Sequence, residues 1–237
     1  MGRFPNIAAA KEKTGAAKAK LYSMYGKEIY QEARNGGSDP DGNLSLRRLI
    51  EKARRDQVPS DVIKRALDKV NSGIDESYVS ATYELFGPGG STLIIECLTD
   101  NLNRSVSSIR TVLNKCKIKM GSQGSVSYNY DHLGVVGFKG FDEEDILNVL
   151  ILNDIDMDDF EVENGITYVY GKPSDLFRIK EAILTLNKNL EFEMDEISYF
   201  PKETIKLSDE DLTIFNKTMD LLEEIEDVQH IYHNVEL

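Results

Sequence analysis

The chain has 237 residues, 41% of them hydrophobic and 29% charged, which is typical of soluble globular proteins and allows one large domain or two to three small ones. Its longest apolar runs are only a few residues, so we expect neither a transmembrane helix nor a signal peptide. The two cysteines, Cys97 and Cys116, argue against a disulfide framework and fit a reducing compartment, so a cytoplasmic location is expected.

The net charge of −13 argues at first against a nucleic-acid partner, but the charges are unevenly distributed. Residues 1–73 contain 15 Lys/Arg and 9 Asp/Glu, a net charge of +6, whereas residues 74–237 contain 13 and 32, a net charge of −19. An acidic body repels phosphate, so any nucleic-acid contact should be confined to the basic head and its neighbours. The alternative is that these charges form only a solvated helical face.

The first third of the chain is predicted to be helical. Residues 1–19 carry lysines among alanines without an apolar stripe, so we predict a basic flexible arm, which either orders on a polyanion or only aids solubility. From 20 to 77, three apolar stripes at helical spacing predict a small helical domain. Gly36-Gly37 should end its first helix, while Asn43 and Ser60 should cap the next two. The third helix has interrupted charges and is not predicted to be a recognition helix.

The middle of the chain reads as strand, strand, helix, strand. Tyr83–Phe86 and Thr92–Leu98 are β-rich runs joined by Gly87-Pro88-Gly89-Gly90, which favours a hairpin. Asp100 or Asn103 is expected to cap the helix that follows. After it, Val126, Tyr128 and Tyr130 alternate as in a strand. The helix should bury one side on the sheet through five apolar residues, Val106, Ile109, Val112, Leu113 and Cys116.

A second pattern occupies residues 133–200. Two strands there are predicted to pair across Asn164-Gly165, the strongest hairpin dipeptide, and Ser174 should cap the second helix. The order is βαββαβ, the ferredoxin-like pattern. Its predicted elements are Val135–Lys139, Glu143–Leu152, Phe160–Glu163, Ile166–Tyr170, the helix after Ser174 and Glu191–Tyr199.

The remaining tail predicts one helix, with Ser208 and Asp211 in capping-box-like spacing, and one strand, Val228–Val235. These have no partner in the second pattern but would complete the sheet of the middle unit. We therefore predict an α+β protein with an N-terminal three-helix domain and two ferredoxin-like α/β domains, one inserted in the other. The expected bounds are 20–77 for the helical domain, 78–132 with 201–237 for the discontinuous domain and 133–200 for the insertion.

Several of these stretches resemble the YebC/PmpR family of gene-expression regulators, which includes the mitochondrial activator of cytochrome oxidase subunit translation. The similar runs are MGRFPNI with the Lys/Ala-rich segment after it, VPSDVIKRALDKVNSG, FGPGGSTLIIECLTDNLNR and GSQGSVSYNYD. The resemblance covers the chain end to end and implies the same three-domain layout. Phe4-Pro5 departs from the family, which usually has a Trp shortly before Asn-Ile, so no role of that Trp is carried over.

Catalytic and metal chemistry find little support in the sequence. Of the three histidines, His230 and His233 lie at odd spacing on a strand and should point to opposite faces, and no Cys/His cluster has zinc spacing. The glycine-rich turn at Gly87 lacks the Lys-Ser/Thr of a phosphate loop. No carboxylate pair or nucleophile is marked by its context. We therefore predict a non-enzymatic protein without cofactors or metal ions.

The chemistry that remains is cationic. Lys and Arg neutralise phosphates and release counterions, Asn and Arg can bond to base edges, and the free N–H groups at a helix start favour an anion. Asn103 has a competing role as a cap, so Arg104 and Lys115 are the stronger candidates in the middle unit. The predicted nucleic-acid-binding residues are Arg3, Lys11, Lys13, Lys18, Lys20, Lys27, Arg47, Arg48, Arg54, Arg55, Asn103, Arg104 and Lys115.

The resemblance implies two versions of a nucleic-acid-binding regulator. One is a ribosome-associated translation factor that relieves stalling, and the other is a transcriptional regulator bound to promoter DNA. The overall negative charge and the lack of a recognition helix favour docking to a ribonucleoprotein over groove reading. A third possibility is a protein-interaction scaffold with an incidental basic head. We expect a monomer with no membrane contact and no small-molecule substrate.

Overall fold

The computed structural model describes residues 15–73 and 77–236. The described part of the chain forms two compact units, one made of 15–126 and 205–236 and the other of 127–204. Most of the predicted basic arm, including Arg3, Lys11 and Lys13, lies outside the described residues. None of the helices in the described ranges is long and apolar enough to cross a membrane.

Three helices open the first unit, and each buries one stripe. Asn43 caps α2, as predicted, by accepting a hydrogen bond from the Leu46 N–H at 3.1 Å. Gly37 follows α1 with φ +96°, a left-handed conformation that ends helices and favours glycine. Buried residues of all three helices share one core. The helices are α1 (Gly15–Gly36), α2 (Leu44–Arg55) and α3 (Ser60–Asn71).

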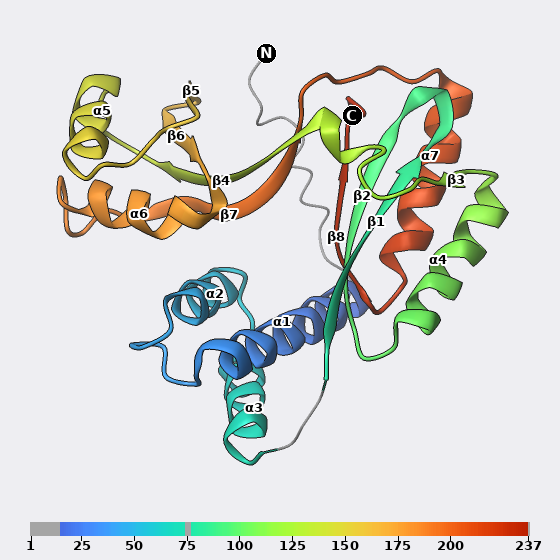
Figure 1. Cartoon of the computed structure of the whole chain (residues 1–237), viewed down its shortest axis with the longest axis horizontal. Coiled ribbons are helices and arrows are strands. Elements are labelled where there is room, and N and C mark those ends of the chain that lie inside the picture. The colour runs from blue at the N-terminus through green and yellow to red at the C-terminus, as the bar shows by residue number, and fades with distance from the viewer. Residues whose placement is uncertain (1–14, 74–76, 237) are drawn as a thin grey trace. The chain divides into compact units, whose positions relative to one another are not determined.

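The first unit also contains an antiparallel sheet in the order β3-β1-β2-β8, so that the last strand of the chain pairs with β2. Helices α4 and α7 lie on the same side of this sheet (Figure 1) and bury Ile109 and Phe215 against Leu93 and Ile95. Ser208 caps α7, as predicted, through the Asp211 N–H. The elements are β1 (Val79–Phe86), β2 (Thr92–Thr99), α4 (Leu102–Cys116), β3 (Lys119–Met120), α7 (Asp209–Glu223) and β8 (Val228–His233).

The second unit is a four-stranded antiparallel sheet in the order β5-β6-β4-β7 with two helices packed on it. Its chain order is βαββαβ, as predicted. The β5–β6 turn has positive φ at both Asn164 (51°) and Gly165 (77°), as a type I′ hairpin requires. The elements are β4 (Tyr130–Phe138), α5 (Glu143–Leu152), β5 (Asp159–Glu163), β6 (Ile166–Gly171), α6 (Leu176–Leu184) and β7 (Phe192–Pro201).

The predicted fold class is therefore confirmed, while several local predictions are wrong. Residues 126–130 do not form a strand of the first sheet: its third strand is β3, Ser127–Asn129 is a 3-10 turn, and Tyr130 begins β4 of the other sheet. The reason is a distant acceptor, because the buried Glu84 carboxylate accepts hydrogen bonds from the N–H groups of Gly124 (2.7 Å) and Val126 (2.5 Å) and holds this loop as a turn.

Three helix starts also differ from prediction. Helix α1 begins at Gly15 rather than Lys20. Ser60 is the first residue of α3, whose N-cap position is taken by Pro59, so its side chain does not cap the helix. Ser174 lies in the 3-10 turn Pro173–Asp175, two residues before α6 begins. In both serine cases the helix begins at a different residue from the one predicted, so the serine does not occupy the N-cap position.

Candidate nucleic-acid interface

The most strongly basic surface of the helical head lies on α2. Its apolar stripe of Leu46, Leu49, Ile50 and Ala53 is buried, which leaves five Lys/Arg and only one acid, Glu51, outside that stripe. Among the predicted binding residues, Arg47 bonds Asp41 at 2.5 Å and Arg54 is exposed with no ion pair in the described ranges. Arg48 and Arg55 lie on the same helix and have partners of their own.

Helix α3, which follows the short turn, has a nearly balanced surface. Arg65 forms an ion pair with Asp61 at 3.0 Å, one turn away on the same helix, and Asp68 offsets a further cation. A helix that reads bases in the major groove places hydrogen-bonding side chains along one face without neighbouring acids. The cations of the head therefore lie on α2, away from the position that a recognition helix would take.

Two predicted lysines of α1 are already bound within the first unit. Lys20 donates a hydrogen bond to the Glu223 carbonyl oxygen, and its burial lowers the pKa of its ammonium group despite the nearby Glu223 carboxylate. Lys27, whose side chain is only 11% exposed, lies 3.4 Å from the Glu226 carboxylate and 3.5 Å from that of Asp227. Lys18, two residues before Lys20, is exposed and has no partner among the described side chains.

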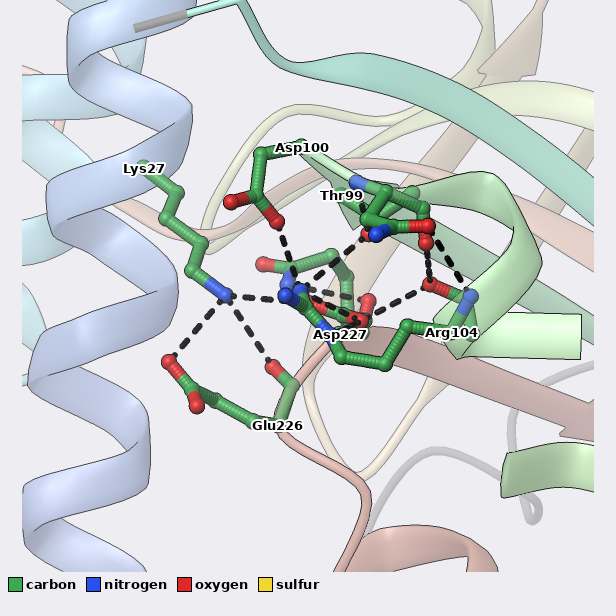
Figure 2. Close-up of polar contacts among 9 residues, drawn as sticks. Lys27, Thr99, Asp100, Arg104, Glu226 and Asp227 are labelled. Atoms are coloured by element: carbon green, nitrogen blue, oxygen red, sulfur yellow. Dashed lines mark hydrogen bonds and ion pairs between the residues drawn. The ribbon is translucent and has the colours of Figure 1, made fainter. Parts of the chain in front are cut away.

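Asp227 is the centre of this cluster (Figure 2). Its buried carboxylate accepts two hydrogen bonds from Arg104 Nη2, at 2.9 and 3.0 Å, and one from the Ser105 hydroxyl at 2.8 Å. Burial alone would raise the pKa of Asp227, but the hydrogen bonds from Ser105, Arg104 and Thr99, with the charge of Lys27, hold it below its ordinary value. The cluster joins α1, α4 and the loop before β8.

Arg104 occupies the first turn of α4 but is not free. Its side chain is 51% exposed, as predicted, and yet it bonds Asp100 at 2.6 Å in addition to Asp227. The predicted caps Asp100 and Asn103 are wrong: Asn101 caps α4 by accepting from the Arg104 N–H at 3.1 Å, and Asn103 is exposed inside the helix. A binding role of Arg104 and Asn103 stays a prediction.

Lys115 lies at the other end of α4 and is exposed, with no ion pair in the part of the chain that the structure describes. Three further exposed cations near it were not predicted, namely Arg110, Lys117 and Lys119. A simple signal could have found them, because residues 101–120 contain five Lys/Arg and no Asp/Glu in an otherwise acidic region.

Metal binding receives no support from the geometry. The described residues contain no group of three or more His, Cys, Asp or Glu side chains that could hold a metal ion. Cys97 and Cys116 are buried and free. His230 lies 3.3 Å from Glu28 of α1, whereas the His233 ring packs at 5.1 Å from Phe215 of α7, so the two histidines face different elements.

Comparisons with known proteins cover the whole chain. The family model described as the second and third domain of TACO1/YebC proteins matches residues 78–235, and the one described as their N-terminal domain matches residues 2–73. The chain is 47% identical over 235 residues to a probable transcriptional regulatory protein of Alteromonas mediterranea, covering 99% of this chain and 98% of the relative. It is 48% identical over 238 residues to one from Vibrio parahaemolyticus, covering 100% of both.

A solved structure is similar along its full length. The crystal structure of a conserved hypothetical protein from Aquifex aeolicus superimposes with a TM-score of 0.78 at 29% sequence identity. The match covers 99% of this chain and 97% of the other. The fold, with three N-terminal helices and two sheets covered by further helices, is therefore shared with an experimentally determined structure.

Proposed function

Because this chain belongs to the TACO1/YebC family, we propose that it is a non-enzymatic regulator of gene expression that binds nucleic acid, with the ribosome as its main target. The family resemblance predicted from the sequence motifs is confirmed, and relatives at 47–48% identity are named as probable transcriptional regulatory proteins. On the ribosome, the expected action is relief of stalling in the cytoplasm.

One observation carries the choice of target: the cations gather on α2, whereas α3 has a nearly neutral surface. Phosphate contacts from scattered Lys and Arg position a protein on nucleic acid without reading its sequence. A folded ribosomal RNA presents a fixed pattern of phosphates and needs no base readout. The head of this chain is therefore better suited to docking on RNA than to reading a promoter.

Transcriptional regulation through promoter DNA is the second candidate, and the names of the relatives favour it. This function requires contacts to specific bases, because each wrong base pair in a specific site weakens the free energy of binding by about 1–3 kcal/mol. The two candidates are thus distinguished by sequence dependence as well as by the partner.

The test compares both partners at one physiological salt concentration. Ribosomal particles and a panel of promoter fragments are mixed with the full-length protein, and binding is measured by co-sedimentation and by fluorescence anisotropy. We expect firm association with ribosomes and weak duplex binding without sequence preference. A tight DNA site whose single-base variants lose tenfold or more, without co-sedimentation, would overturn the ribosomal proposal. Ribosome profiling of a deletion strain then tests whether stalling increases.

The contribution of the head is measured with a matched pair of variants. Lys18→Gln with Arg54→Gln removes two exposed cations of the head that have no ion pair in the described ranges. Lys188→Gln with Lys217→Gln removes two similar cations elsewhere and serves as the control pair. Ribosome affinity should fall about tenfold in the first pair, with a shallower dependence on salt, and should remain unchanged in the control.

A further inference from the structure

The outward face of α4 stands apart from the rest of the acidic body. Residues 101–120 contain five Lys/Arg and no acid, which leaves eight Lys/Arg against 32 Asp/Glu in the remainder of residues 74–237. A solvated helix face in an acidic protein normally mixes both signs of charge. The absence of any acid over these twenty residues is therefore a property that the surrounding composition does not account for.

Helix geometry places two of these cations in the solvent-facing half of α4. Ile109, Leu113 and Cys116 are buried against the sheet, and at 100° per residue Arg110 and Lys115 fall about 140° apart, on the two flanks of the outward half. Lys117 follows at the C-terminal end of the helix, and Lys119 is the first residue of β3. Two exposed neutral polar residues, Thr111 and Asn114, lie between Arg110 and Lys115, while Asn103 and Ser107 are exposed nearer the start of the helix.

These cations are available, in contrast to Arg104. Within the described ranges, the side chains of Arg110, Lys115, Lys117 and Lys119 form no ion pair or hydrogen bond. A cation that is not already paired gains the full electrostatic benefit of a phosphate and releases a counterion. The face is thus open to an anionic partner.

Stabilisation of the helix explains only part of the pattern. Lysines in the last turn interact favourably with the helix dipole, which suits Lys115. Arg110 lies in the middle of α4, where the dipole has little effect. Lys117 adopts the left-handed conformation, with φ 57° and ψ 36°, at the position after the helix where glycine is usually preferred. The backbone preference therefore does not account for a lysine at this position.

We propose that this α4 face, defined as Arg110, Lys115, Lys117 and Lys119 with the neutral polar residues between them, is a second RNA-binding surface. The inference rests on the proposed ribosomal function and extends it from the head to the middle of the chain. Lys and Arg hold the phosphates, while Asn, Ser and Thr are suited to sugar hydroxyls and phosphate oxygens. An acidic protein segment would meet the cations but would make less use of these neutral hydrogen-bonding groups.

The experiment compares Arg110→Gln with Lys115→Gln against the control pair Lys188→Gln with Lys217→Gln. Both double variants remove two exposed cations that lack ion pairs in the described part of the chain, so their net charges are equal. Each full-length protein is titrated with ribosomal particles and, separately, with a labelled 20-nucleotide single-stranded RNA at several salt concentrations. Circular dichroism confirms that each variant is folded.

We expect the α4 pair to bind both RNA partners about tenfold more weakly, with a salt slope shallower by roughly two, and the control pair to match the parent protein. Equal binding by the two pairs to both partners overturns the α4 surface while leaving the proposed function intact. If the parent protein does not bind ribosomes, the proposed function fails. In that case, selective loss of single-stranded RNA binding in the α4 pair still supports the surface, and equal RNA binding by the two pairs overturns it.

Discussion

The two ends of α4 carry exposed cations that differ in one respect, which is whether an acid is already bound to them. At the N-terminal end, Arg104 is half-exposed but holds Asp227 and Asp100 at 2.9 and 2.6 Å. Arg110, in the middle of the helix, and Lys115, in its last turn, are exposed with no ion pair among the described residues. The helix rises by about 16 Å between Arg104 and Lys115, so these are two separate surfaces.

This difference shows that an exposed cation can already be paired with acids of its own chain. Arg104 serves to join α4 to the loop before β8, and Lys27 extends that contact to α1. A phosphate would have to displace carboxylates there, whereas it would displace only solvent ions from Lys115. We therefore expect mutations at the first end to change stability and mutations at the second end to change binding.

The largest effect is expected from Asp227→Ala. The variant leaves the Arg104 guanidinium and the Ser105 hydroxyl without their buried acceptor, and Lys27 loses one of its two carboxylates. Removing one partner of a buried pair typically costs 3–5 kcal/mol, and because Arg104 is half-exposed we expect about 3 kcal/mol. Urea denaturation, together with hydrogen exchange in α1 and α4, measures the loss.

A matched variant tests whether burial is the cause. Asp100→Ala removes the other carboxylate that pairs with Arg104. Because that pair is exposed, the free energy of unfolding of the variant should be lower than that of the parent protein by less than about 1 kcal/mol. A similar loss in both variants would show that the cluster has no special role. RNA affinity at the other end of α4 should stay unchanged in both.

At acidic pH, the stability that the Asp227 carboxylate contributes should become smaller. The pKa of Asp227 is lower in the folded chain than in the unfolded one, because the donors around it outweigh its burial. A lowered carboxylate pKa contributes stability that is complete above the unfolded pKa of about 3.9 and is lost as the pH falls through the folded value. The stability difference between the parent protein and Asp227→Asn should thus be constant from pH 7 to 5 and shrink below about pH 4. A difference that is unchanged at pH 3 would rule out this linkage.

Much of the fold could be predicted because its determinants are local. The Asn164-Gly165 turn, the Asn43 and Ser208 caps and the bounds of α5 follow from turn chemistry and helical period over a few residues. The strand predicted at 126–130, which is not formed, shows the limit of local patterns. Its residues alternate as in a strand, but the N–H groups of Gly124 and Val126 bond to Glu84, some forty residues earlier.

The candidate site was harder to predict for the same reason. Helical geometry correctly predicted that Arg104 would be exposed, yet its partner Asp227 is 123 residues away in the sequence. The available cations Arg110, Lys117 and Lys119 could have been found from composition alone, since no acid occurs in residues 101–120. The signal lies in the charge of the whole segment rather than in the position of any single residue.

Removal of the N-cap of α4 should cause an intermediate loss of stability. Asn101→Ala removes the acceptor of the Arg104 N–H, which typically costs about 1 kcal/mol. Asn103→Ala is the control, because Asn103 lies inside the helix, where alanine is favoured and stability should not fall. Thermal denaturation of both variants measures these changes. A larger loss of stability in Asn103→Ala than in Asn101→Ala would contradict the assignment of Asn101 as the cap.

The smallest expected change in stability is at Lys117, a residue at which substitution should affect both stability and RNA binding. Its left-handed backbone suits glycine, so Lys117→Gly should relieve strain and stabilise the chain by about 0.5 kcal/mol after the greater flexibility of glycine in the unfolded chain is counted. Lys117→Ala removes the same charge but keeps the strain, so it should not stabilise. If the α4 face binds RNA, both variants should lose RNA affinity equally, by about twofold to threefold, although only one becomes more stable. Denaturation and RNA titration of the two variants separate the effect of backbone strain on stability from the effect of charge on binding. An RNA affinity that rises in Lys117→Gly alone, in parallel with its stability, would mean that the Lys117 charge has no part in binding.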